Sequence, residues 1–191
     1  MERDEIINKF IETRGFNKYL EIGIWNGSNF GKINAKFKVG VDPDINSKAT
    51  IHLTSDEYFS LTNEKFDIVF IDGLHLCEQV YKDIMNSLSH LNPNGVIVLH
   101  DLLPFNEIRQ GREAVDGGWN GDCWKAFVKY RHDSEYLCYV IDMDQGCGVI
   151  DTSKRNETDN STLPTDMNSL TWNDFCQNRN VWMNVKSDII A

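Results

Sequence analysis

The sequence predicts a Rossmann-like α/β fold, in which apolar strands of a mostly parallel sheet alternate with helix-length segments. The first indication lies in residues 18–44, where an apolar strand ends in Glu21 and is followed by a glycine turn, a helix and a second strand ending in Asp42. Carboxylates at two such strand ends are how an α/β fold holds a ribose-bearing cofactor. The second indication is the segment 66–73, whose apolar run is interrupted only by Asp67 and therefore suits a central strand buried on both faces.

The glycine spacing in the first turn narrows the choice of cofactor. A dinucleotide site has the pattern G-x-G-x-x-G, whose second glycine lets the backbone approach the pyrophosphate. Here Gly23 is followed by Trp25 at that second position, and the next glycine is Gly27. A phosphate would meet the indole of Trp25, which argues against a dinucleotide.

Further strands are predicted where short apolar runs are bounded by polar or turn-forming residues. The runs 136–141 and 148–150 are separated by the turn 142–146, which indicates a hairpin. The segment 49–53 is a shorter candidate with polar flanks. In chain order, the predicted strands cover residues 18–22, 38–41, 49–53, 66–73, 96–99, 136–141 and 148–150.

Helices are predicted where apolar residues recur at helical spacing. Residues 3–14 carry such a stripe, which is expected to cover the edge or face of the sheet and consists of Ile6, Ile7, Phe10 and Ile11. Residues 77–91 carry a second stripe, and the sequence Asn-Pro-Asn-Gly at 92–95 ends that helix.

The chain is expected to form one domain over residues 1–151, because 191 residues suffice for a single core. Residues 152–168 are rich in Ser, Thr, Asn and Asp, which predicts a polar linker. Residues 169–191 are expected to form a C-terminal helical segment, whose aromatic side chains pack on the same domain or on a partner subunit. Assembly into a homo-oligomer therefore stays an open alternative.

Composition excludes several classes of partner. The formal net charge of −10 repels phosphate backbones and anionic headgroups, so neither nucleic acid nor a membrane surface is the expected partner. The N-terminus has no apolar signal sequence, and no apolar run reaches the roughly 20 residues of a transmembrane helix, which predicts a cytoplasmic protein. Five cysteines without C-x-x-C spacing indicate neither a disulfide framework nor a zinc ribbon.

The pattern E-x-G-x-x-x-G, followed by an acid at the end of the next strand, resembles motif I of class I S-adenosylmethionine-dependent methyltransferases. In that family the loop surrounds the methionine part of the cofactor, and the second acid, here Asp42, binds both ribose hydroxyls. The resemblance implies a mostly parallel seven-stranded sheet with helices on both faces and an antiparallel terminal strand. The loop residues that it assigns to cofactor binding are Glu21, Gly23, Trp25, Gly27 and Ser28.

Ligands of open α/β sheets bind beyond the carboxyl ends of the strands, and this rule gathers titratable groups along one rim. The family places adenine contacts after the third strand, where Ser55 and Asp56 stand, although both residues also suit a helix N-cap. Residues 72–75 (Asp-Gly-Leu-His) and 100–101 (His-Asp) resemble motifs of a branch of small-molecule and sugar O-methyltransferases. The residues on this rim are Glu21, Asp42, Ser55, Asp56, Asp72, His75, His100 and Asp101.

Methyl transfer to oxygen requires an acceptor stripped of its proton, so a base or a divalent cation must stand beside the methyl group. Metal-assisted relatives such as catechol O-methyltransferase imply a magnesium or manganese ion at Asp72, His100 and Asp101, although a histidine ligand favours a transition metal. Without a metal, His75 or His100 is the candidate general base, and Asp101 orients it. Both routes stay open at this point.

The segment 104–123 is long for a connection in a compact domain, which favours a lid or a binding loop. Within it, Trp119 is expected to form an apolar wall for the acceptor. Trp124, at the start of the next predicted helix, is expected to lie in the core.

The predicted function is therefore methyl transfer from S-adenosylmethionine to an oxygen of a small molecule, for example a sugar. Two alternatives stay open. One is a metal-dependent hydrolase that uses a cluster of Asp72, His75, His100 and Asp101 and needs no nucleoside cofactor. The other is a non-catalytic module that keeps the fold and acts by assembly through its C-terminal segment.

Overall fold

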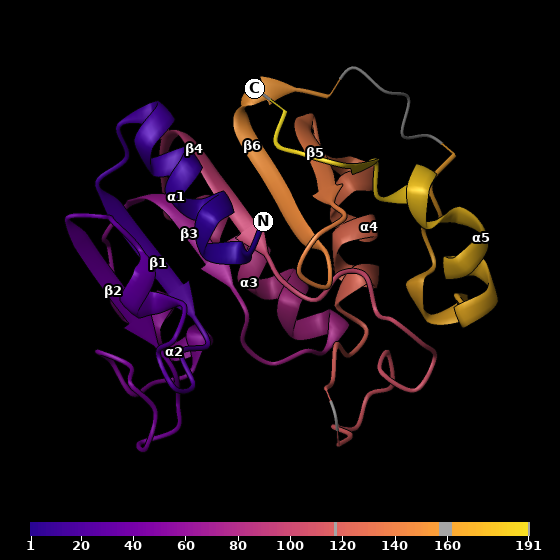
Figure 1. The fold of residues 1–191 in the computed structure, drawn as a ribbon, viewed down its shortest axis with the longest axis horizontal. Coiled ribbons are helices and arrows are strands. Elements are labelled where there is room, and N and C mark those ends of the chain that lie inside the picture. The colour runs from indigo at the N-terminus through magenta and orange to yellow at the C-terminus, as the bar shows by residue number, and fades with distance from the viewer. Residues whose placement is uncertain (117, 157–161, 191) are drawn as a thin grey trace.

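A seven-stranded sheet in the order β2-β1-β3-β4-β6-β5-β7 organises the computed structural model, which describes residues 1–116, 118–156 and 162–190 (Figure 1). In the described part of the chain, β6 alone runs antiparallel to its neighbours, β4 and β5. The predicted α/β fold with a mostly parallel seven-stranded sheet is confirmed. The strands are β1 (Lys18–Ile22), β2 (Phe37–Val41), β3 (Phe66–Ile71), β4 (Leu91–Leu99), β5 (Tyr136–Ile141), β6 (Cys147–Arg155) and β7 (Val185–Lys186).

Helices cover both faces of the sheet, and the apolar side chains of each strand alternate between the two faces. In β3, Ile68 and Phe70 pack with helix α1 (Arg3–Arg14), whereas Val69 and Ile71 pack on the opposite face. That opposite face carries α2 (Ser55–Leu61), α3 (Cys77–Ser89), α4 (Cys123–Asp133) and α5 (Trp172–Trp182).

Two elements between β1 and α2 differ from the prediction. The helix expected between the first two strands is a single 3-10 turn, Phe30–Lys32. The residues before this turn form tight turns and leave little chain for a longer helix. In one of these turns Ser28 N–H donates to Asn26 Oδ1 over 3.0 Å. The strand expected at 49–53 is reduced to one parallel bridge between Ile51 and Val41, because α2 follows directly.

The seventh strand comes from the C-terminal segment and lies at the opposite edge of the sheet. β7 pairs in parallel with β5, with Val185 beside Val140. In front of it, the fully buried Phe175 of α5 packs into the core, with its ring centroid 5.0 Å from that of Trp124. The aromatic segment therefore packs on its own domain, and Trp124 lies in the core as predicted.

The first residues of the segment expected as a linker belong to the sheet. β6 continues to Arg155, four residues into the range 152–168, and Thr152 Oγ1 donates to the carbonyl oxygen of Gly95. Residues 157–161, in the middle of the expected linker, lie outside the described residues.

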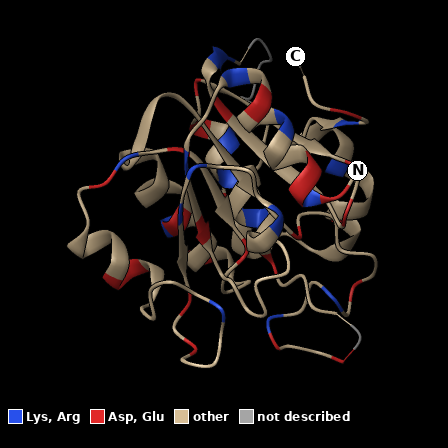
Figure 2. Ribbon diagram, turned by 60° about the vertical axis from the view of Figure 1, so that its left-hand side comes forward, with Lys and Arg blue, Asp and Glu red and all other residues tan. Residues whose placement is uncertain are grey.

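The charged residues are interspersed by sign over the ribbon (Figure 2). Acidic and basic side chains pair repeatedly across elements, as in the ion pairs of Arg14 with Asp151 and of Lys18 with Glu64. Among the described helices, none has the length and apolar content needed to span a bilayer.

Replacing Phe175 by alanine tests whether α5 is part of the domain core. We expect Phe175→Ala to lower the free energy of unfolding by about 3–5 kcal/mol, because a fully buried aromatic ring leaves a cavity. Urea unfolding followed by tryptophan fluorescence measures the change. The control Val181→Ala removes a side chain of the same helix that is 69% exposed, and we expect a change within about 0.5 kcal/mol. Equal effects of the two substitutions would show that α5 contributes nothing to the core.

Candidate active site

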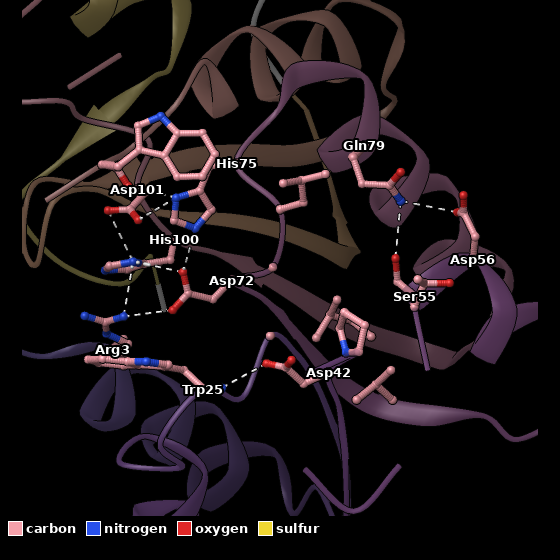
Figure 3. A pocket seen from close by; sticks show the side chains of 18 of the residues that line it. Arg3, Trp25, Asp42, Ser55, Asp56, Asp72, His75, Gln79, His100 and Asp101 are labelled. Carbon is pink, nitrogen blue, oxygen red and sulfur yellow. Dashed lines mark hydrogen bonds and ion pairs between the residues drawn. The ribbon is translucent and has the colours of Figure 1, made fainter. Parts of the chain in front are cut away.

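A cavity of about 710 Å³ lies beyond the carboxyl ends of β1 to β5 (Figure 3). One end is polar and lies at the start of α2, the other end is a cluster of charged side chains, and Asp42 stands between them. Its volume lies in the range of cofactor and small-molecule sites. Lining residues include Gly23, Trp25, Asp42, Ser55, Asp56, Asp72, His75, Gln79, His100, Asp101, Trp119 and Gln145.

Most of the residues that the sequence assigns to a site meet in this cavity. The predicted catalytic residues His75, His100 and Asp101 all line it. The same holds for six of the predicted cofactor-binding residues, Gly23, Trp25, Asp42, Ser55, Asp56 and Asp72. Three others do not form its wall, namely Glu21, Gly27 and Ser28.

The Glu21 carboxylate turns away from the cavity into the protein. It is 2% exposed, and its Oε2 accepts hydrogen bonds from the Tyr19 hydroxyl and, over 2.9 Å, from Asn29 Nδ2. Burial raises the pKa of Glu21 to about 7, and the hydrogen bonds from Tyr19 and Asn29 only partly offset it. Glu21 therefore ties β1 to the following loop and does not face a ligand directly.

The loop after β1 is held by the carboxylate of Asp42. Its Oδ2 accepts the N–H groups of Ile24 and Trp25, both over 2.9 Å. Trp25 has φ +46° and a side chain that is 77% exposed, so it adopts the left-handed backbone that a glycine would favour there. Gly23, with φ +86°, lies against β3, where a Cβ would be 2.1 Å from the carbonyl oxygen of Asp72. Gly27 and Ser28 shape the next turn instead.

The polar end of the cavity is built at the start of α2. The N-cap of this helix is Thr54, which forms a capping box with Glu57, so Ser55 and Asp56 stand one and two residues inside the helix. Gln79 of α3 reaches across and donates to Ser55 Oγ over 3.2 Å and to Asp56 Oδ1 over 3.3 Å. Sequence reasoning missed Gln79, whose position inside a predicted helix carries no signal.

Four predicted residues form the charged end of the cavity. His75 stands between two carboxylates, with Nε2 3.4 Å from Asp72 Oδ1 and Nδ1 3.4 Å from Asp101 Oδ2. His100 Nδ1 lies 3.4 Å from both Asp72 Oδ1 and Asp101 Oδ1. Asp101 has φ +62°, a strained backbone that turns the chain sharply at the end of β4.

These contacts shift the pKa values of the cluster. Burial raises the pKa of Asp72, but hydrogen bonds from His100 and His75 outweigh it and lower that pKa well below its usual range. Burial lowers the pKa of both imidazoles, yet the neighbouring carboxylates raise the pKa of His75, and more strongly that of His100, above the usual range. The cluster thus stabilises carboxylates and imidazolium groups together.

The long loop after β4 closes the cavity over His75. The Trp119 carbonyl oxygen lies 2.8 Å from His75 Nδ1, and the two rings pack with centroids 5.2 Å apart. Asn120 is fully buried and donates to Asp101 Oδ1 over 2.8 Å. Gly121 has φ +60°, and a Cβ there would lie 1.8 Å from the carbonyl oxygen of His75, so the close approach requires glycine.

Sequence reasoning missed two charged residues of the site, Arg3 and Asp144. Asp144 stands in the hairpin turn after β5, and the turn is held against β4 by the hydrogen bond from Leu103 N–H to the Gln145 carbonyl oxygen over 2.8 Å. Asp144 could have been predicted from the sequence, because ligands bind beyond the carboxyl ends of the strands and Asp144 follows such an end. Arg3 begins α1, far from any strand end, and its guanidinium donates to Asp72 Oδ2 over 2.9 Å.

Two clusters have donor types suited to a divalent transition metal, with ligand atoms within 4.8 Å of one another. One comprises Asp72, His75 and Asp101, and the other His100, Asp144 and Cys147. In the first, however, the carboxylates face opposite nitrogens of the His75 ring, and the Arg3 guanidinium already pairs with Asp72. The side chains of this first cluster, as placed, fit an ion-paired cluster better than a metal ion.

A family model described as a methyltransferase domain matches residues 35–102 of the chain. The matched range starts before β2 and ends after β4, so it contains Asp42, the segment 72–75 and the pair His100-Asp101. No curated protein sequence matches significantly.

Solved structures share the fold at low sequence identity. An O-methyltransferase from Bacillus cereus in complex with SAH has a TM-score of 0.57 at 11% identity, covering 78% of this chain and 80% of that one. The O-methyltransferase of tomaymycin synthesis from Streptomyces achromogenes, in complex with SAM, has a TM-score of 0.58 at 13% sequence identity, and the match covers 78% of each chain. An SAH-bound methyltransferase from Podospora anserina has a TM-score of 0.55 at 13% sequence identity, and the match covers 81% of this chain and 78% of that one.

The sheet order β2-β1-β3-β4-β6-β5-β7 belongs to an α/β fold that this chain shares with solved methyltransferase structures. The family match over residues 35–102 agrees with the resemblance of the sequence to class I S-adenosylmethionine-dependent methyltransferases.

Replacing Glu21 by glutamine tests the buried carboxyl group. Because the folded-state pKa of Glu21 is about 7 and its unfolded value is near 4.5, the folded protein binds the extra proton and wild-type stability falls as pH rises between these values. Glutamine removes this titration, so we expect Glu21→Gln to gain stability relative to wild type, on the order of 3 kcal/mol, between about pH 5 and pH 8. Urea unfolding at both pH values measures it. A difference that does not change with pH would contradict the raised pKa.

Proposed function

We propose that this protein transfers the methyl group of S-adenosylmethionine to an oxygen atom of a hydroxylated small molecule, such as a catechol or a sugar. The observation that carries the proposal is one continuous cavity, with a carboxylate in its middle, a polar end and a cluster of histidines and carboxylates at the other end. The relatives from Bacillus cereus and Streptomyces achromogenes, which are O-methyltransferases in complex with SAH and SAM, support this choice of cofactor and chemistry.

The middle and the polar end of the cavity suit a nucleoside. Asp42 Oδ1 accepts the N–H of Asp44 over 2.9 Å and has capacity for a further hydrogen bond, which a ribose hydroxyl can donate. Ser55 and Gln79 offer a hydroxyl and an amide at the polar end, and we assign them to the adenine edge. S-adenosylmethionine, when bound, supplies an activated methyl group. Gly23 and Asp72 remain for the methionine part.

His75 is the candidate general base. Nδ1 faces the Trp119 carbonyl oxygen, which can only accept a hydrogen bond, so that nitrogen carries a proton. Nε2 is then the atom that can take the proton of an acceptor hydroxyl when His75 is neutral, a form that the raised pKa of His75 makes more abundant at higher pH. Trp119 packs against the ring and lines the cavity, which supports the prediction that it forms an apolar wall for the acceptor.

His100 and Asp101 are proposed to position the other groups. The His100 side chain is 2% exposed and is held between Asp72, Asp101 and Asp144, which leaves it little access to an acceptor. Asp101 pairs with His75 Nδ1 and is fixed by the Asn120 amide. Both residues therefore act through His75 and Asp72.

The fold and the family match favour a methyltransferase over a metal-dependent hydrolase that would use the same cluster. A hydrolase of that kind needs ligands that converge on a cation, whereas Asp72 and Asp101 here converge on an imidazole. The C-terminal segment is packed within the sheet and core, so the assembly alternative has no special support from it.

Calorimetric titration with S-adenosylhomocysteine tests the cofactor site. We expect micromolar binding by the wild type and about 10- to 100-fold weaker binding by Asp42→Asn, because a charge-assisted hydrogen bond to the ribose is lost while an acceptor oxygen remains for the loop. Asp44→Asn is the matched control, since it makes the same change two residues away and outside the cavity wall. Absence of binding by the wild type would refute the proposed function.

Methyl transfer is then measured with radiolabelled S-adenosylmethionine on a panel of catechols and sugars. For an acceptor that is turned over, we expect His75→Asn to lower kcat by about 10²- to 10⁴-fold, because the general base is removed. Affinity for S-adenosylhomocysteine should stay within a few-fold of wild type, which separates a catalytic from a folding defect. A kcat unchanged by His75→Asn would assign the base to another group.

A further inference from the structure

Arg3 lies at the point where the two clusters of metal-ligand type meet. It is the first residue of α1, 69 positions before Asp72 and 141 before Asp144, and it contacts both. Its Nη1 is 2.9 Å from Asp72 Oδ2 and 3.2 Å from His100 Nδ1, while Nε is 2.8 Å from Asp144 Oδ2. One guanidinium group therefore touches a carboxylate of each cluster.

The backbone fixes this guanidinium in place. The Arg3 N–H lies in the first turn of α1, where it has no partner within the helix, and it donates to Asp144 Oδ2 over 3.0 Å. The Asp144 carboxylate thus receives the backbone and the side chain of the same residue, at the positive end of a helix. Asp144 itself is held by the hairpin turn between β5 and β6. The cation cannot leave without unpairing Asp72 and Asp144 together.

We propose that Arg3 is a positioning residue that supplies, permanently, the positive charge that a divalent cation would otherwise supply between Asp72, Asp101 and Asp144. The proposal deepens the proposed function, since it implies methyl transfer without an added metal. Only this implication rests on the proposed function. The planar guanidinium suits the role because it binds several carboxylate oxygens in fixed directions, which a lysine ammonium does less well.

The charge has two consequences for the site. Near Asp72, it keeps the carboxylate ionised and turned so that Oδ2 faces α1 and Oδ1 faces the two imidazoles. Near the cavity, which Arg3 also lines, it stabilises negative charge that develops on an acceptor oxygen as its proton leaves. Removing Arg3 would leave Asp72, Asp101 and Asp144 with unbalanced negative charge, and such a group of carboxylates attracts a divalent cation.

The experiment compares Mn²⁺ binding by wild type and Arg3→Ala, measured by calorimetry and by the electron paramagnetic resonance of free Mn²⁺. We expect weak or no binding by the wild type at about 1 mM Mn²⁺, and binding at least about tenfold tighter by Arg3→Ala, because the competing cation is gone. Arg3→Lys restores a charge and should return the affinity towards that of wild type. Lys9→Ala, which removes a half-exposed cation from the same helix, is the control.

Wild-type binding as tight as that of Arg3→Ala would overturn the proposal, and so would equal gains in Arg3→Ala and Lys9→Ala. The wild-type titration judges the proposal even where Arg3→Ala does not fold, because micromolar Mn²⁺ binding by the intact protein contradicts a resident arginine cation. S-adenosylhomocysteine binding is measured on the same samples. Its failure in the wild type refutes the proposed function, whereas the Mn²⁺ result concerns Arg3 alone. Wild-type methyl transfer should persist in EDTA, and a complete loss there would count against the proposal.

Discussion

The structure of the site depends on keeping three carboxylates close together in a mostly buried place. Asp72, Asp101 and Asp144 stand at the ends of three different strands, and their mutual repulsion would be severe without compensation. Two imidazoles and a guanidinium provide it, each placed between two or more of the carboxylates. This mutual dependence explains why the cluster draws on α1, on the loop after β4 and on the hairpin turn, which are remote in sequence.

The rest of the cavity follows from the geometry of parallel strands. Because β1, β2, β3 and β4 run in one direction, the loops after them meet at one edge, and a single carboxylate, Asp42, can hold the loop of its neighbour β1. That arrangement forces Trp25 into a left-handed backbone and turns its indole outwards. Trp25 nevertheless lines the cavity, at the position where a dinucleotide site has a glycine.

Much of this edge was predictable from sequence, because an apolar run locates a buried strand and the residue after the run is then placed on the rim. Asp42, Asp72, His75 and His100 were found in this way. Arg3 was not, since its role depends on how α1 packs over the sheet, and helical periodicity carries no information on that. The sequence placed Glu21 correctly on its strand, but the direction of its side chain was not predicted. The Tyr19 hydroxyl lies on the same side of the strand and binds the Glu21 carboxylate inside the protein.

The two ends of the cavity are built from different parts of the chain, and the proposed function assigns one end to the cofactor and the other to the acceptor. The polar end is built by regular elements, β2, α2 and α3, whose positions the sheet fixes. The end proposed for the acceptor is walled by Trp119 and completed by Asn120 and Gly121, from a long loop whose path depends on one close backbone approach to His75. Under the proposed function, a change in that loop alters the acceptor wall without moving the sheet. The charged cluster beneath the loop ties it, through Asp101, to His75, the proposed base. The proposed function therefore assigns selectivity for the acceptor to the loop and the chemistry to the strand ends.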